Sequence, residues 1–273
     1  MAISRVASGL CDGIARVLIA WGVRPNAITA AGLVLAVYAA AWLVIGAGHA
    51  PPWEAGRAPT PASFLPLIAA VVLVLAGACD ILDGAVAHVG KQRSPFGALL
   101  DSTLDRFSDL FIFGGCAIHF SLVGNITYVL LSVTAAANAV LISYVKARAE
   151  NFIDHCGVGY WQRAERYGVF LLAACLGRVP AALWLLGTLP LLTVIGRLLH
   201  ARRVMTGGAS SESMAAEHSP HRLVPRRHPR GSAGYLVSLA LMAAYLFAGP
   251  LLWPALYGES DPVGAALRKL IGA

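Results

Sequence analysis

The sequence has few charged residues. Of its 273 residues only 13% are charged, whereas 58% are hydrophobic and the mean hydropathy is +0.68. A soluble domain carries about 25% charged residues. The shortage therefore argues against the one or two ordinary soluble domains that this length would allow, and it indicates lipid as the solvent for much of the chain.

Cysteine motifs and internal repeats are also missing. The number of cysteines is odd, and no CxxC spacing occurs, so neither a disulfide framework nor a zinc site is predicted. We expect the cysteines to be single buried residues in helices. They are Cys11, Cys79, Cys116, Cys156 and Cys175. No repeat of fixed period and no soluble domain is visible.

Apolar runs fill most of the chain, and a membrane span needs about 20 apolar residues. The sequence predicts an all-α polytopic transmembrane bundle with six core spans and a possible seventh, C-terminal span. The expected core spans are Ile28–Ala47, Phe64–Ala87, Phe96–Val123, Thr127–Val145, Tyr167–Leu176 and Ala181–Leu199. The run Tyr235–Tyr257 is long enough for the seventh.

Basic residues mark the cytoplasmic side. The net charge is +7, and Lys and Arg gather in the loops 88–93, 146–166 and 202–203, whereas the loops 48–63 and 123–125 have almost none. This bias predicts a cytoplasmic N-terminus. The basic residues lie beside apolar spans, so we expect the partner to be the bilayer and not nucleic acid.

The same features predict four regions. Residues 1–24 should form an interfacial amphipathic helix, because Arg5 and Arg16 interrupt an apolar pattern. Residues 25–203 should form the six-span core, and residues 204–233 a basic cytoplasmic loop. Residues 234–273 should hold the possible extra span and a tail.

Aspartates within the apolar spans are the strongest functional signal. Five of the eight aspartates lie in or at the ends of spans, and they are Asp80, Asp83, Asp101, Asp105 and Asp109. A charge in hydrocarbon costs about 2.5–3.5 kcal/mol even on the lenient scale. The spacings i, i+3 and i, i+4, i+8 place the acids of each helix on one face. Two helices thus aim carboxylates at one point, and we expect two divalent cations, Mg²⁺ or Mn²⁺, to neutralise them. The alternative is a set of structural pairs at helix ends.

The spacing of these residues resembles the CDP-alcohol phosphotransferase motif D-x2-D-G-x2-A-R-x8-G-x3-D-x3-D. The corresponding residues here are Asp80, Asp83, Gly84, Ala87, His88, Gly97, Asp101 and Asp105. All spacings match, and His88 replaces the motif arginine. The resemblance implies metal ligation by the four aspartates, with Asp105 also acting as the catalytic base.

The resemblance also implies a site for a CDP-linked lipid. Gly84 and Gly97 would let the nucleotide lie close to the helices, and Asp80, Ala87 and His88 would line the same site. His88 could supply part of the missing cation when protonated, or Lys91 or Arg93 could supply it. The segment Pro25-Asn26-Ala27-Ile28-Thr29 looks like the family's P-[ND]-x-x-T element, which places Asn26 and Thr29 near the nucleotide. Capping of a helix explains Asn26 and Thr29 equally well.

A narrower resemblance concerns the second substrate. The stretch 143–150, S-Y-V-K-A-R-A-E, is similar to bacterial phosphatidylinositol phosphate synthases, as are segments 163–166 and 196–197, where Gly196 replaces a glutamine. It implies an acceptor-phosphate pocket, because a phosphate is best bound by several arginines. Its residues would be Ser143, Lys146, Arg148, Arg166 and Arg197. Ordinary positive-inside arginines are the alternative.

The expected reaction follows from these resemblances. A phosphatidyl group would pass from CDP-diacylglycerol to a polar alcohol phosphate, best matched by inositol 1-phosphate, and CMP would leave. The family also implies a homodimer in the bacterial inner membrane, with the active site facing the cytoplasm. Glycerol 3-phosphate is the alternative acceptor. An ion-coupled transporter is the alternative class, although the acids cluster at cytoplasmic helix ends and no internal repeat is visible.

Overall fold

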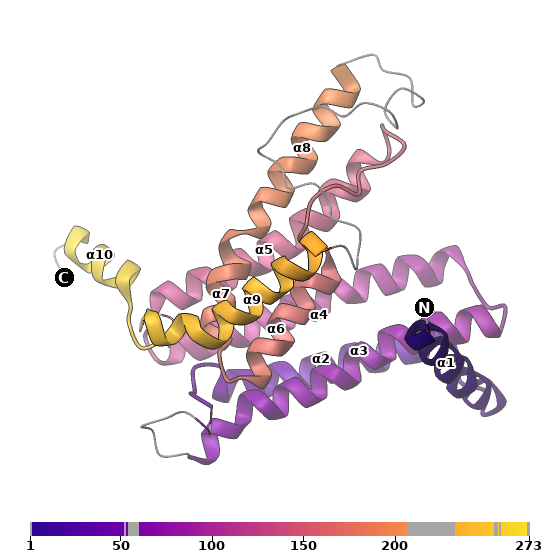
Figure 1. The fold of residues 1–273 in the computed structure, drawn as a ribbon, viewed down its shortest axis with the longest axis horizontal. Helices are drawn as coiled ribbons and strands as arrows, with labels where there is room; N and C mark the ends of the chain where they lie inside the picture. The colour runs from indigo at the N-terminus through magenta and orange to yellow at the C-terminus, as the bar shows by residue number, and fades with distance from the viewer. Residues whose placement is uncertain are drawn as a thin grey trace.

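The computed structural model describes residues 2–51, 53, 60–206, 233–253, 256 and 258–271. In this part of the chain the regular structure is helical throughout, which confirms the predicted fold class (Figure 1). The α-helices are α1 (Ala2–Ala20), α2 (Pro25–Gly46), α3 (Leu65–Val89), α4 (Pro95–Leu122), α5 (Ile126–Ala149), α6 (Arg163–Cys175), α7 (Val179–Thr188), α8 (Pro190–Thr206), α9 (Ala233–Leu252) and α10 (Pro262–Ile271). A short 3₁₀ helix, Pro61–Phe64, precedes α3.

Proline and capping side chains set the starts of the long helices. α2 and α4 begin with a proline, whose missing N–H would have no partner in the first turn in any case. The Ser94 hydroxyl accepts a hydrogen bond from the Gly97 N–H at 3.0 Å and so caps α4. Asn125 occupies the same position before α5. The sequence therefore fixes where the helices that carry the acidic and basic motifs begin.

The helices pack around one core. α2 packs against both α3 and α4, and α5 packs against α4, α7 and α8. A Cβ on Gly115 of α4 would lie 2.7 Å from the Ala40 carbonyl oxygen of α2, so this close approach requires glycine. In Figure 1, α2 and α3 run together while α8 diverges from them. α6 packs against α3 and α7.

The membrane spans agree with the prediction in part. Five helical stretches are long and apolar enough to cross a bilayer, namely 25–46, 61–89, 126–149, 179–206 and 234–252. α4 is long enough, but it carries the charged motif. The expected fifth span falls in α6, which has only 13 residues. The expected sixth span is divided between α7 and α8 at Pro190. The number of spans stays a prediction.

Outside the core, the structure bears on only some of the predicted regions. α1 is a helix that packs against α3, with Ala15 buried beside Val86, while its place at the interface stays a prediction. The expected basic loop 204–233 lies, apart from its ends, outside the described residues. Large apolar side chains such as Val34, Val71 and Leu130 are exposed on the spans. Exposed apolar surface of this kind suits contact with lipid.

Candidate active site

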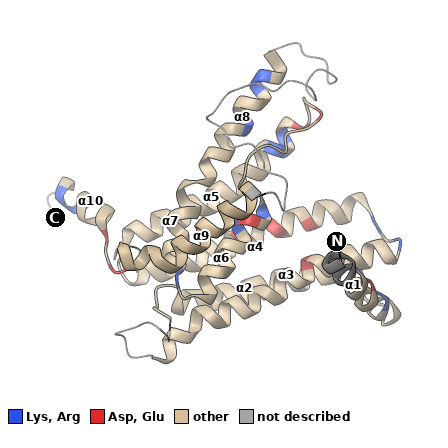
Figure 2. Ribbon diagram, in the orientation of Figure 1, with Lys and Arg blue, Asp and Glu red and all other residues tan. Residues whose placement is uncertain are grey.

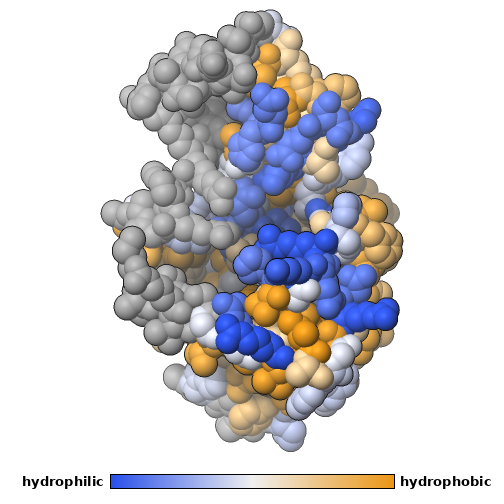
Figure 3. Space-filling model, turned by 90° about the vertical axis from the view of Figure 1, so that its right-hand side faces the viewer, coloured by the Kyte–Doolittle hydropathy of each residue, from blue (hydrophilic) through white to orange (hydrophobic). Residues whose placement is uncertain are grey.

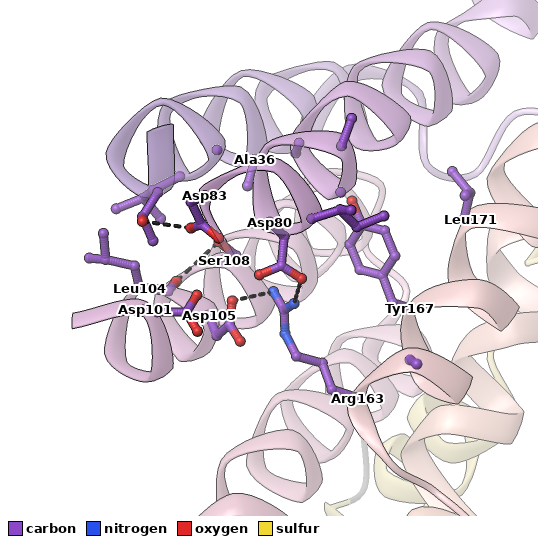
Figure 4. A pocket seen from close by; sticks show the side chains of 18 of the residues that line it. Ala36, Asp80, Asp83, Asp101, Leu104, Asp105, Ser108, Arg163, Tyr167 and Leu171 are labelled. Atoms are coloured by element: carbon purple, nitrogen blue, oxygen red, sulfur yellow. Dashed lines mark hydrogen bonds and ion pairs between the residues drawn. The ribbon is translucent and has the colours of Figure 1, made fainter. Parts of the chain in front are cut away.

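Three aspartates from two neighbouring helices lie close together. Asp80 comes from α3, and Asp101 and Asp105 lie one turn apart on α4. A carboxylate oxygen from each lies within 4.8 Å of the others (Figure 4). The predicted convergence of the two helices on one point is therefore present in the structure. Like charges this close repel, so the arrangement requires a cation.

Asp83 does not belong to this group of three and instead accepts a hydrogen bond from α2. Its side chain is buried, and its Oδ2 accepts a hydrogen bond from the Thr29 hydroxyl at 2.6 Å. The structure thus places Thr29 against a motif aspartate rather than at a helix cap alone. Asp83 and Thr29 both line the two cavities described below, which makes them part of the wall between the cavities.

Arg163 supplies a cation to the acidic group. This first residue of α6 places Nη1 3.1 Å from Asp80 Oδ2 and Nη2 2.8 Å from Asp105 Oδ1 (Figure 4). Its guanidinium also lies over the Tyr167 ring, 5.8 Å from the centroid. A single +1 charge cannot neutralise three carboxylates. Asp101 Oδ1 is buried and accepts no hydrogen bond among the described residues.

The donor set suits hard divalent cations. Carboxylate oxygens are the ligands that Mg²⁺ and Mn²⁺ prefer. The buried, unsatisfied oxygen of Asp101 points to a missing positive partner at this position, because a buried acceptor without a partner is costly. Asp80, Asp101 and Asp105 therefore fit a metal centre, and Asp83 lies one helical turn beyond Asp80 on α3.

Two cavities meet at this centre. The larger, of about 950 Å³, is lined by Asp80 and Asp105 and by polar side chains from the second half of the chain, among them Lys146, Gln162 and Arg163. The smaller, of about 260 Å³, lies beside it between α2, α3 and α4. Both have Thr29, Asp83 and Asp101 in their walls. Figure 3 shows hydrophilic side chains gathered in the middle and upper part of the face at this end of the molecule.

The smaller cavity collects most of the residues predicted to bind CDP. It is lined by Asn26, Thr29, Gly84, Ala87 and Gly97, among others. A Cβ on Gly84 would meet no atom within 4 Å, so it would extend into open space that a ligand can occupy. A Cβ on Gly97 would lie 3.1 Å from Ser94 Oγ. The role of both glycines in nucleotide binding stays a prediction.

His88 is not among the lining residues of the smaller cavity. Arg93, five residues later and beyond the end of α3, is. The turn between α3 and α4, which contains Lys91 at a φ of 51°, places Arg93 beside the cavity. Of the three candidates for the missing cation, only Arg93 is among the lining residues of this cavity.

The five predicted acceptor residues do not surround one space. Lys146 lines the larger cavity. Arg166 is buried and pairs with Asp109 at 3.1 Å. The Ser143 hydroxyl donates to the Ala139 carbonyl at 3.4 Å. The Arg148 guanidinium stacks 5.1 Å from the Phe152 ring centroid.

Arg197 is the most enclosed of the five, with 1% of its surface exposed. Its Nε donates to the Val158 carbonyl at 3.0 Å, its Nη2 donates to Gln162 Oε1 at 3.0 Å, and its Nη1 donates to the Ile142 carbonyl. It reaches the larger cavity through Gln162, which lines that cavity. Arg197 therefore holds the segment before α6 against α5.

Sequence reasoning left Arg163, Gln162 and Tyr167 out of the expected site. All three line the larger cavity. Arg163 precedes Arg166 by three residues, and Tyr167 follows Arg163 by four, so on α6 they share a face. That spacing was the available signal. It is easily overlooked, because a loop arginine near a span is ordinarily a topological signal.

Comparison with known proteins identifies the family. The sequence model described as CDP-alcohol phosphatidyltransferase matches residues 22–206, which is more than half of the chain. The chain belongs to this family. It is thus a membrane transferase, as the motif predicted, and the enzyme class is favoured over the transporter alternative.

Individual relatives and structures in the family agree. The chain is 31% identical over 202 residues to the phosphatidylinositol phosphate synthase of Corynebacterium glutamicum, covering 70% of this chain and 84% of that one. It is 36% identical over 137 residues to the archaetidylinositol phosphate synthase of Methanothermobacter thermautotrophicus, covering 48% and 68%. A crystal structure of Mycobacterium tuberculosis phosphatidylinositol phosphate synthase with CDP-DAG bound aligns with a TM-score of 0.59 at 26% identity, covering 70% and 92%. Another structure of that enzyme contains manganese and citrate.

Proposed function

We propose that this enzyme transfers the phosphatidyl group of CDP-diacylglycerol to inositol 1-phosphate at the cytoplasmic face of the bacterial inner membrane and releases CMP. The observation that carries the proposal is the pair of cavities that share Thr29, Asp83 and Asp101. One is lined by the residues predicted to bind CDP, and the other holds basic residues. The names of its relatives and the CDP-DAG bound in the mycobacterial structure support the same substrates.

The acidic centre prepares the diphosphate for reaction. Asp80, Asp83, Asp101 and Asp105 would hold two divalent cations, Mg²⁺ or Mn²⁺, and these ions supply the positive charge that stabilises CMP as it leaves. Asp101 lies in the walls of both cavities, and the bond that breaks would lie beside it. The manganese in the mycobacterial structure supports a metal centre in this fold.

We propose that Asp105 acts as the base. It lines the larger cavity, and its carboxylate can accept a proton. The acceptor hydroxyl gives its proton to Asp105 while its oxygen attacks the lipid-side phosphorus. A new P–O bond forms, and the P–O bond to CMP breaks with its electron pair going to CMP.

The basic residues beyond the acidic centre would receive the acceptor phosphate. Ser143, Lys146, Arg148, Arg166 and Arg197 remain the proposed set. Lys146 is the member that lines the cavity. Arg197 borders the cavity through Gln162, to which it donates a hydrogen bond. Lys146 and Arg163 bring positive charge to the cavity wall, which suits a substrate that carries its own phosphate. We also propose that the enzyme works as a homodimer.

The test is an acceptor screen with the full chain in lipid nanodiscs. CMP release from CDP-diacylglycerol is measured with inositol 1-phosphate, inositol and glycerol 3-phosphate, and the lipid product is identified by mass spectrometry. We expect inositol 1-phosphate to give the highest kcat/KM. A higher value with glycerol 3-phosphate would replace the proposed acceptor. Equal use of inositol and its phosphate would remove the phosphate pocket.

A further inference from the structure

The segment that follows α9 is clamped to the start of α5. The side-chain amide of Asn125 donates to the carbonyl oxygens of Gly258 at 2.9 Å and Ser260 at 3.1 Å. Asp261 Oδ1 accepts hydrogen bonds from the backbone N–H of Thr127 at 2.9 Å and from its hydroxyl at 2.8 Å. These contacts join residues more than 130 positions apart, and their C-terminal partners lie outside the matched family region 22–206.

The same aspartate also begins α10. Asp261 Oδ1 accepts a hydrogen bond from the Gly264 N–H at 3.1 Å, and Oδ2 pairs with Arg268 at 3.2 Å. The Val263 N–H donates to the Thr127 hydroxyl at 2.9 Å. Burial opposes ionisation of the carboxyl, but the hydrogen bonds from Thr127, Gly264 and Arg268 hold the pKa of Asp261 below its usual range. One ionised side chain thus fixes the starts of two helices.

This clamp lies at the end of the bundle opposite the catalytic cavity. Lys146, which lines the cavity, follows Thr127 on α5 by 19 residues. At 1.5 Å per residue this separation is about 28 Å, close to the thickness of the hydrocarbon core. Figure 2 shows the basic residues of α10 at the far end of the molecule from the acidic residues of α3 and α4.

α10 is amphipathic, and it packs against α5. Leu267, Leu270 and Ile271 are 40%, 81% and 73% exposed. On a helix these three share a face with Val263, whereas Ala265 and Lys269 lie on the opposite face.

We propose that α10 lies in the lipid interface of the membrane leaflet opposite the catalytic cavity. Its apolar face rests in the boundary between headgroups and acyl chains, and Lys269 and Arg268 meet anionic headgroups. This inference is independent of the proposed function. It gives the C-terminal region the role of an anchor that tethers the outer end of α5 to the bilayer surface.

The surroundings favour lipid over a second copy of the chain. α9, which leads to α10, exposes Leu241, Phe247 and Leu251 as a membrane span does. Trp253 follows α9 and is 54% exposed, and tryptophan is enriched at membrane interfaces. A stable protein interface buries about 1,200–2,000 Å². Three apolar side chains on a ten-residue helix offer far less than that.

The test is hydrogen–deuterium exchange of the full chain in nanodiscs. We compare the wild type, the double variant Leu267→Glu/Leu270→Glu and the matched control Ala265→Glu, which adds an acid to the opposite face. We expect the α10 amides to exchange at least about tenfold faster in the double variant, because two leucines lose their burial in lipid. The control should exchange as the wild type does. Protection of the Ala139 amide, in the core part of α5, reports in all three that the bundle is folded.

Lipid composition tests the charge. Lys269→Glu avoids the clamp, since Arg268 keeps its bond to Asp261. We expect anionic lipid to slow exchange of α10 in the wild type and to do so less in Lys269→Glu. Wild-type exchange rates in the double variant would overturn the proposal. Protection of α10 in discs that hold two copies, but not in discs that hold one, would also overturn it and assign the apolar face to a second copy.

Discussion

At each end of the bundle, aspartates lie where two helices come together, but their charges are compensated differently at the two ends. Asp261, at the end away from the cavities, receives three hydrogen bonds and a salt bridge within the chain. At the catalytic end, Asp80 and Asp105 share Arg163, and Asp101 keeps a buried oxygen without a hydrogen bond among the described residues. The protein supplies enough donors and positive charge for the carboxylate of Asp261, but not for the three carboxylates of the acidic centre.

This difference separates a structural acid from the acids that we propose to be catalytic. A carboxylate whose donors are all supplied by the protein has its role fulfilled on folding. A cluster that repels itself is retained only if something from outside compensates the charge, because the cost of an uncompensated buried charge is large. Neutralising an aspartate should therefore affect catalysis at one end of the bundle and local stability at the other. The predictions below change these two sites and the residues around them.

The largest effect should come from neutralising the acidic centre. We expect Asp101→Asn to lower kcat for CMP release by about a thousandfold or more, because metal ions at such sites contribute several kcal/mol to the transition state. Asp80→Asn and Asp83→Asn should behave alike. EDTA should abolish turnover, and added Mg²⁺ or Mn²⁺ should restore it.

The matched control for that series is Asp261→Asn, which removes the same charge at the other end. It should keep wild-type kcat. Full activity in EDTA would contradict the metal centre. Equal losses of kcat in Asp101→Asn and Asp261→Asn would contradict the distinction between the two ends.

The next effect concerns the acceptor side of the large cavity. Lys146→Ala should raise the KM for inositol 1-phosphate by about ten- to a hundredfold, since it removes a charge-assisted contact. The KM for CDP-diacylglycerol should change little. Arg148→Ala should do less, because Arg148 stacks on Phe152. A larger effect of Arg148→Ala on the acceptor KM would mean that the occupied cavity is arranged differently.

A smaller effect on the KM for CDP-diacylglycerol is expected from changes in the smaller cavity, which we propose binds the nucleotide. Arg93→Ala should raise the KM for CDP-diacylglycerol by about tenfold, because Arg93 is the arginine among the lining residues and a charge-assisted contact contributes about that much. His88→Ala should change it less. His88→Arg should retain or raise activity, and in Arg93→Ala it should restore part of the loss. A folded but inactive His88→Arg protein would show that the site depends on histidine.

The convergence of Asp80, Asp101 and Asp105 could be predicted because helical spacing is local information, whereas the separate position of Asp83 could not. Asp80 and Asp83 lie on one helix, Asp101 and Asp105 lie on the next, and helical spacing alone fixes their faces. The long apolar runs predicted the helices in the same way. The sequence could not predict features that depend on helix breaks and long-range contacts. Examples are the division between α7 and α8 at Pro190 and the length of α6, which has 13 residues. No periodicity predicts where a short helix ends.

The acceptor side shows the same limit from another direction. Arg166 and Arg197 were assigned by resemblance, but their contacts with Asp109 and Gln162 join segments 57 and 35 residues apart. The charge of an arginine and its position in the sequence do not show whether its side chain faces a cavity or forms hydrogen bonds within the protein. The same is true of Asp261, which drew no attention because it stands alone near the C-terminus. Its importance comes from Thr127, on a helix far away in sequence.

The smallest expected effect on catalysis is that of Asp261→Asn, and its consequence should be local. Asparagine keeps an oxygen acceptor but loses the charge that Arg268 and the N–H groups favour, so we expect a loss of about 1–2 kcal/mol in the stability of the clamp. Hydrogen exchange at the Thr127 and Gly264 amides measures it. Because the pKa of Asp261 is lowered on folding, its contribution is complete at neutral pH and is lost as pH falls through that lowered value. Acidification should therefore speed exchange at these amides in the wild type and change it little in Asp261→Asn. If both proteins respond alike to acid, the clamp does not depend on this carboxylate, and the contrast between the two ends of the bundle fails.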